Sequence, residues 1–249
     1  MIRSLDVLRS YTIRATDDVL GGVRDLYFDD TSWTVRYLVV DTGTWLPGRS
    51  VLIPTSALGK PDAARQHFPV DLTRRQVKDS PDVDVDRPVS RQVEADVYGY
   101  YGWAPYWGAG AGVAPGMPGY MAVPPPQTAP PVRHREEGDP HLRSGREVTG
   151  YYIGASDGDV GHVDDLLVED DGWRLRYLLV DTVNWLPGRK VLVASDWIRS
   201  VSWSEQKIHV GLTREQVKNS PEYDEVAGVN RAYEEQLYAH YGERPYWGV

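Results

Sequence analysis

The chain has 249 residues, of which 41% are hydrophobic and 25% charged, as in an ordinary soluble globular protein. Its 36 acidic residues outnumber its 27 basic ones and give a net charge of −9, which disfavours direct nucleic-acid binding because an acidic surface repels phosphate groups. The sequence contains no cysteine, and this excludes disulfides, thiolate nucleophiles and cysteine-based metal sites.

The beginning of the chain alternates charged and apolar residues and lacks the continuous apolar segment of a signal peptide. Nowhere does the sequence contain the run of roughly 18 apolar residues that a membrane-spanning helix needs. We therefore expect a cytoplasmic protein without membrane insertion.

The two halves of the sequence repeat each other at a constant offset, so that Trp33 recurs as Trp173 and Pro81 as Pro221. Residues 33–49 (WTVRYLVVDTGTWLPGR) and 173–189 (WRLRYLLVDTVNWLPGR) are identical at 12 of 17 positions. We therefore predict an internal duplication. The predicted organisation is a first barrel at 1–81, its helix and aromatic tail at 82–108, a linker rich in Gly, Ala and Pro at 109–140, a second barrel at 141–221, and its helix and tail at 222–249.

The expected elements of the second half have equivalents at the same offset in the first. Strands are predicted at 148–155, 160–168, 173–181 and 190–193, followed by a hairpin of 197–203 and 207–212. Thr213, with Gln216 three residues later, forms a capping-box pattern that predicts a short helix ending before Pro221. A second helix is expected at 230–241, where apolar residues recur at every fourth position. Short strands in close succession favour a mainly β fold of two small tandem barrels, which would leave no exposed sheet edges.

Three features recur in both halves of the sequence. The first is a Gly-x-Val-x-Asp-Leu stretch at 21–26 and 161–166. The others are the strand Trp-x-x-Arg-Tyr-Leu-x-Val-Asp at 33–41 and 173–181 and the segment Leu-Thr-x-x-Gln-Val-Lys-x-Ser-Pro at 72–81 and 212–221. Together, and in this order, the three features resemble the PRC-barrel family over residues 5–81 and 145–221. The resemblance implies two PRC-type barrels in tandem.

The resemblance also indicates the class of function. PRC-barrel domains form the cytoplasmic domain of the H subunit of photosynthetic reaction centres and the C-terminal domain of a ribosome maturation factor. Such domains imply binding or scaffolding and not catalysis. The favoured hypothesis is a non-catalytic interaction protein with a protein partner, folded as a pseudo-dimer within one chain or forming a homo-oligomer. The alternatives are a peripheral component of a photosynthetic or electron-transfer membrane complex, and a ribosome-assembly factor that binds a ribosomal protein.

The most distinctive segment is the loop at 41–49, repeated at 181–189. One interpretation is a rigid connection with a Pro-Gly turn, in which Arg49 pairs with Asp41 or stacks on Trp45. The other is a surface for a partner, because exposed Trp and Arg are typical interface residues. The candidate interaction residues of the two loops are Asp41, Trp45, Arg49, Asp181, Trp185 and Arg189.

The repeated Pro-Tyr-Trp-Gly tails are the second candidate. They either dock on an apolar strip of a barrel in the same chain or bind another molecule, and their candidate residues are Tyr106, Trp107, Tyr246 and Trp247. The acidic turns lack the spacing of a calcium-binding EF-hand loop, and the six histidines form no helical zinc-binding pair. No nucleophile motif or phosphate-binding loop is present. We therefore expect no metal, no cofactor and no enzymatic activity.

Overall fold

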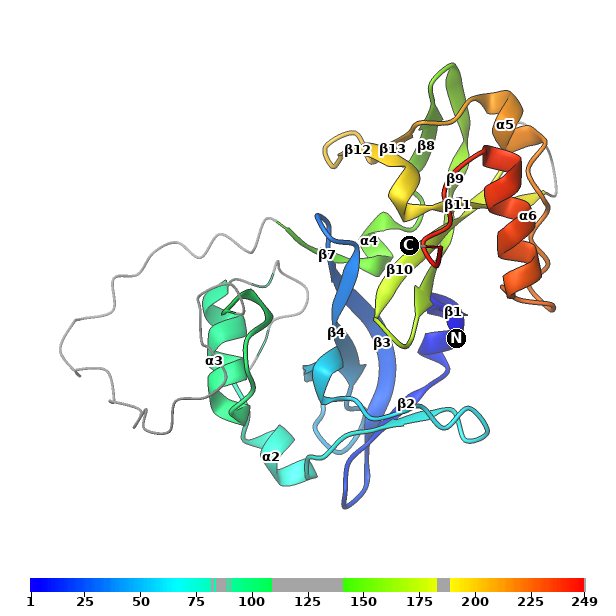
Figure 1. Ribbon diagram of the computed structural model, residues 1–249. Coiled ribbons are helices and arrows are strands. Elements are labelled where there is room, and N and C mark those ends of the chain that lie inside the picture. The colour runs from blue at the N-terminus through cyan, green and yellow to red at the C-terminus, as the bar shows by residue number, and fades with distance from the viewer. Residues whose placement is uncertain (82, 84–88, 90, 109–140, 183–188, 249) are drawn as a thin grey trace, which may run out of the picture.

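The computed structural model describes residues 1–81, 83, 89, 91–108, 141–182 and 189–248 (Figure 1). The elements of the first half are β1 (Ile2–Ser4), α1 (Leu5–Arg9), β2 (Thr12–Arg14), β3 (Val19–Asp29), β4 (Thr34–Asp41), β5 (Ser50–Pro54), η1 (Thr55–Ala57), β6 (His67–Pro69), α2 (Arg74–Lys78), α3 (Arg91–Tyr101) and η2 (Tyr106–Gly108). Those of the second half are β7 (Leu142–Ser144), α4 (Gly145–Val148), β8 (Tyr152–Ala155), β9 (Gly158–Glu169), β10 (Arg174–Asp181), β11 (Lys190–Ala194), η3 (Ser195–Trp197), β12 (Ile198–Ser202), β13 (Lys207–Val210), α5 (Arg214–Lys218) and α6 (Arg231–Tyr241).

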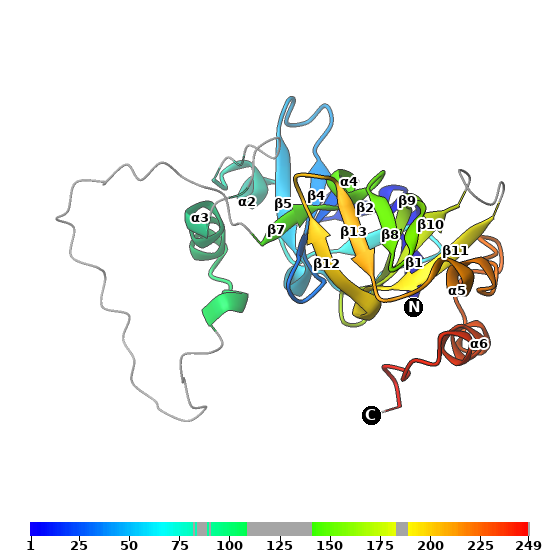
Figure 2. The same cartoon turned by 90° about the horizontal axis from the view of Figure 1, so that it is seen from above.

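Corresponding elements occur in the same order in the two halves. The antiparallel strands β3, β4 and β5 match β9, β10 and β11 in pairing and in burial pattern. In β4 and β10, the last three apolar residues before the terminal aspartate are all buried. Their side chains alternate between the two faces of the sheet, and one face packs against the main core while the other packs against a helix. Figure 2 shows that these helices, α3 and α6, lie at opposite ends of the molecule.

The sheet is not closed, which corrects the prediction of two separate closed barrels. Within the described residues the strands form one 13-stranded sheet. Its main path is β12-β13-β8-β9-β10-β4-β3-β2-β6, and β1, β11, β5 and β7 pair beside this path with β9, β10, β4 and β3 respectively. The sheet continues from one half into the other because β4 pairs with β10. At this junction Val35 N donates to the carbonyl of Trp173 (2.6 Å), and Leu175 N donates to the carbonyl of Trp33 (2.8 Å).

The two halves also exchange their first strands. Strand β1 of the first half pairs with β9 of the second, and β7 of the second half pairs with β3 of the first. The registers are equivalent, since Ser4 lies opposite Leu167 and Ser144 lies opposite Tyr27, which are matching positions of the repeat. Figure 1 shows β7 beside the long strand β3 and β1 beside the second half.

Most predicted elements of the second half are present, with one correction. The predicted strand 148–155 begins only at Tyr152, because Val148 still belongs to helix α4, whose N-terminus is capped by Ser144. The capping boxes at Thr73 and Thr213 are both formed, which confirms the two short helices. Helix α6 confirms the second predicted helix, and its apolar side is buried through Leu237 (0% exposed) and neighbouring tyrosines.

Candidate functional site

Close backbone and side-chain contacts hold the loop after β4. A Cβ atom at Gly21 would lie 1.9 Å from the carbonyl oxygen of Asp41, so only glycine lets β3 approach the start of the loop this closely. Arg49 N donates to the carbonyl of Leu46 (3.3 Å), and Gly48 has φ +76°, as expected for the Pro-Gly turn. The Thr42 hydroxyl lies 2.7 Å and 2.6 Å from the carbonyl oxygens of Leu46 and Arg49 and ties the loop across its base.

Trp45 is half-buried at this loop. Its indole N–H donates to the carbonyl of Leu20 (2.5 Å), and the guanidinium of Arg74 lies 5.0 Å from its ring centre. Arg49 connects the loop to the segment around the end of helix α2. Its guanidinium donates to the carbonyls of Lys78 (2.7 Å) and Pro81 (2.9 Å), and carbonyls at a helix C-terminus lack partners within the helix.

The described ends of the corresponding loop in the second half, Asp181, Thr182 and Arg189, make contacts that match those of the first half. A Cβ atom at Gly161 would lie 2.1 Å from the carbonyl oxygen of Asp181, which is half-buried. Thr182 donates to the carbonyl of Arg189 (2.8 Å), and Arg189 donates to the carbonyl of Ser220 beyond helix α5. Trp185 lies outside the described residues, so its predicted role stays a prediction.

The two aromatic tails lie against their own halves. Tyr106 donates to buried Glu94 (3.1 Å), which also accepts from Tyr37 of β4 (2.6 Å). Trp107 packs edge-to-face on Tyr98 of α3, with ring centres 5.2 Å apart. The tail therefore follows the docking interpretation in the first half.

The second tail repeats this arrangement. Tyr246 donates to buried Glu234 (2.9 Å), which also accepts from Tyr177 of β10 (2.7 Å). Trp247 lies under the guanidinium of Arg231, 3.9 Å from the ring centre. Burial is the main cause that raises the pKa of Tyr246 to about 12, and the adjacent Glu234 raises it further.

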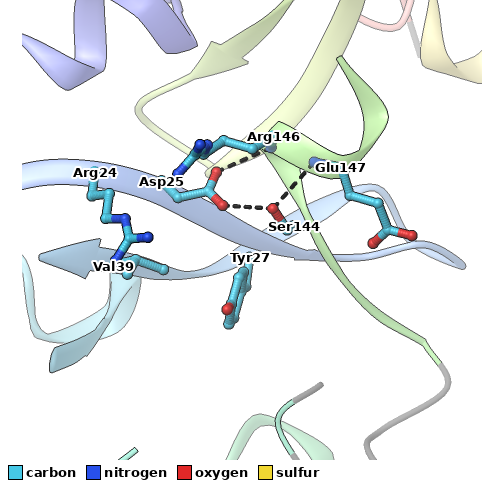
Figure 3. Close-up of a pocket in the computed structure, with 7 residues that line it drawn as sticks. All are labelled: Arg24, Asp25, Tyr27, Val39, Ser144, Arg146 and Glu147. Carbon is cyan, nitrogen blue, oxygen red and sulfur yellow. Dashed lines mark hydrogen bonds between the residues drawn. The ribbon is translucent and has the colours of Figure 1, made fainter. Parts of the chain in front are cut away.

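A third feature joins the two halves at Asp25 of β3, whose side chain is only 6% exposed (Figure 3). Its carboxylate accepts from the Ser144 hydroxyl (2.5 Å), the backbone N–H of Arg146 (3.2 Å) and its neighbour Leu26 N (2.8 Å). Burial raises the pKa of Asp25, although these hydrogen bonds counteract it. A cavity of about 340 Å³ adjoins this contact and is lined by Arg24, Asp25, Tyr27, Val39, Ser144, Arg146 and Glu147.

Asp165 of β9 makes the equivalent contact from the second half to the first. It accepts from the backbone N–H of Asp6 in α1 (3.3 Å) and from Leu166 N (2.7 Å), and burial again raises its pKa. Ion pairs with Arg3 (2.9 Å) and with Arg143 (3.2 Å) hold the exchanged strands to Asp170 and Asp30. In each half, the aspartate of the repeated Gly-x-Val-x-Asp-Leu stretch thus accepts a hydrogen bond from the first helix of the other half.

No metal-binding cluster is found among the residues that the structure describes. They contain no group of three or more His, Cys, Asp or Glu side chains that could hold a metal ion. A second cavity of about 570 Å³ is lined by Lys190, Glu222, Tyr223, Asp224 and Glu225. Lys190 binds Asp164 (2.8 Å) and Glu225 (2.5 Å), and these contacts raise the pKa of its ammonium group. None of the described helices is long and apolar enough to cross a membrane.

The sequence prediction missed the buried polar residues of these contacts. The repeat carried a usable signal, because the members of each set are identical at matching positions of the two halves: Ser4 and Ser144, Asp25 and Asp165, Tyr37 and Tyr177, Glu94 and Glu234. Identity alone does not say that Glu94 is buried beside Tyr37 or that Ser144 reaches the other half. Those contacts depend on how distant segments pack.

Comparison with known proteins identifies one part of the chain. Residues 4–76 match the family profile described as the PRC-barrel domain. A protein of Deinococcus radiodurans, named only as an uncharacterized protein, is 33% identical over 76 residues. The matched segment is 30% of this chain and 27% of that relative, so the similarity spans about a quarter of the relative's length.

Proposed function

We propose that this chain, in which residues 4–76 form a PRC-barrel domain, is a non-catalytic scaffold protein built from two PRC-type halves. The second half supports this proposal because six of its seven described strands, all but β12, repeat those of the first half in the same order, as do its capping box and aromatic tail. The exchanged strands β1 and β7 then make the molecule a pseudo-dimer within one chain.

The scaffold role is inferred from Trp45, which is held in place and yet partly exposed. Its loop is rigidly anchored at Gly21, Thr42 and the Pro-Gly turn, yet the indole ring remains partly accessible beside the guanidinium of Arg74. A pre-ordered aromatic side chain beside a cation binds a protein partner with little loss of conformational entropy. The repeat predicts a second surface of this kind at Trp185.

An affinity purification from the native host tests the proposal. The full chain is compared with a variant carrying Trp45→Ala and Trp185→Ala, and with the control Tyr152→Ala, an exposed aromatic residue on β8. We expect a specific protein that the control retains and the double variant loses, followed by at least roughly tenfold weaker binding of the purified partner. Equal binding by all three proteins would contradict the role of the tryptophan loops.

The identity of the captured protein decides between the classes of partner. A ribosomal protein would support an assembly role, and a subunit of an electron-transfer complex would support a peripheral membrane role. The cytoplasmic location is part of the proposal, and cell fractionation of the host tests it.

A further inference from the structure

The junction between the halves contains a contact between equivalent positions. Leu5 begins helix α1 and Gly145 begins helix α4, and the two residues occupy matching positions of the repeat. They meet in the buried centre of the junction: a Cβ atom at residue 145 would lie 2.9 Å from Cδ2 of Leu5 and 3.1 Å from Cδ1 of Leu26. A large side chain of one half thus fills the space left by a glycine of the other.

The backbone of Gly145 does not need glycine. The residue lies in a regular helical turn, where alanine is more favourable than glycine because it loses less conformational entropy. Leu5 and Leu26 are both 0% exposed, so neither can move into solvent to make room for a larger side chain. We conclude that residue 145 is small because Leu5 occupies the space beside it.

We infer that the contact between Leu5 and Gly145 makes this junction selective for two unlike halves. If the first half paired with the first half of a second copy, the same geometry would bring two Leu5 side chains together. Two second halves would instead place Gly145 against Gly145 and leave a void. Overpacking and voids both destabilise a close-packed core. The partner that fits this surface is therefore an unlike half, which in this structure is the other half of the same chain.

The surface charges, by themselves, would favour pairing of like halves. Arg24 and Arg146 line the same cavity in Figure 3, and Asp6 is adjacent to Asp165, whose carboxylate accepts from the backbone N–H of Asp6 at 3.3 Å. Pairing of like halves would place Asp6 beside Arg24, since Asp6 is the equivalent of Arg146. Arg24, Arg146 and the Asp6 side chain are exposed, however, and water screens such charges, whereas the Leu5 contact lies in the core. Packing therefore decides the pairing.

A double-mutant cycle in the full chain tests the packing argument. Gly145→Leu should overpack the junction and Leu5→Gly should open a void, and each should lower the melting temperature by about 5 °C or more. The double variant exchanges the large and small side chains between the halves, so we expect it to recover most of the loss. Purely additive losses in the double variant would overturn the inference.

Engineered disulfides test which halves pair, and the absence of native cysteine makes the result unambiguous. Ile2 lies opposite Glu169 in the exchanged strands, so Ile2→Cys with Glu169→Cys should form an intrachain disulfide. Asp29 is the equivalent of Glu169, and Ile2→Cys with Asp29→Cys could cross-link only like halves of two copies. Circular dichroism first verifies that both variants are folded. Covalent dimers of the Ile2→Cys/Asp29→Cys variant on a non-reducing gel would overturn the inference, and so would failure of the Ile2→Cys/Glu169→Cys pair to form a disulfide.

Discussion

Removing the carboxylate of Glu234 should weaken the second half more than any exposed substitution on the same helix. Glu234 is 3% exposed and accepts hydrogen bonds from Tyr177 at 2.7 Å and Tyr246 at 2.9 Å. Hydrogen bonds to a charged group contribute about 1.5–3 kcal/mol each, so their loss in Glu234→Ala should cost about 3 kcal/mol or more. For a chain of this length, that corresponds to a fall in melting temperature of roughly 6–12 °C.

The assay is thermal unfolding followed by circular dichroism, with Glu235→Ala as the matched control because Glu235 is the exposed neighbour on α6. Glu234→Gln should lie between the two, since its amide oxygen can still accept from one of the tyrosines. A melting temperature of Glu234→Ala within about 1 °C of the control would refute the argument that this buried carboxylate fastens the tail to β10.

Three further predictions concern the tails, the buried tyrosines and the contact that Asp25 makes between the halves. Truncation after Gly228 removes α6 and exposes its apolar contacts, so the melting temperature should fall, and an unchanged value would contradict tail docking. Burial raises the pKa of Tyr238 and Tyr241 to about 12, above the ordinary value of 10, so the folded state should lose stability as the pH rises from 10 to about 12. Tyrosinate absorbance should then appear together with unfolding, and complete ionisation of the tyrosines in a still folded protein would argue against this. Because the pKa of Asp25 is raised, its contribution to stability is present below pH 3.8 and is lost as the pH rises through the raised pKa. The stability of the wild type relative to Asp25→Asn should therefore fall as the pH rises from about 4 to 7, and a constant difference by denaturant titration would contradict the assignment.

Local features of the chain could be predicted because they depend on neighbouring residues. The Thr213–Gln216 capping box forms through contacts within a single helical turn, and the turn at Gly48 depends on its own backbone conformation. The apolar strand β10 was recognisable because its burial requires a continuous hydrophobic run. By contrast, the contacts of Arg49 with Lys78 and Pro81 could not be predicted, because these acceptors belong to a segment that follows much later in the chain.

The order of the amino acids was enough to establish the repeat, the mainly β character of its elements and the set of residues that recur in both copies. Long-range packing, in contrast, leaves the sheet open and joins β1 and β7 to the opposite halves. Two copies of one motif offer the same hydrogen-bonding edges, so local sequence cannot distinguish pairing within a half from pairing between halves. The choice depends on contacts across the whole chain, such as Leu5 against Gly145 and Asp25 against Ser144.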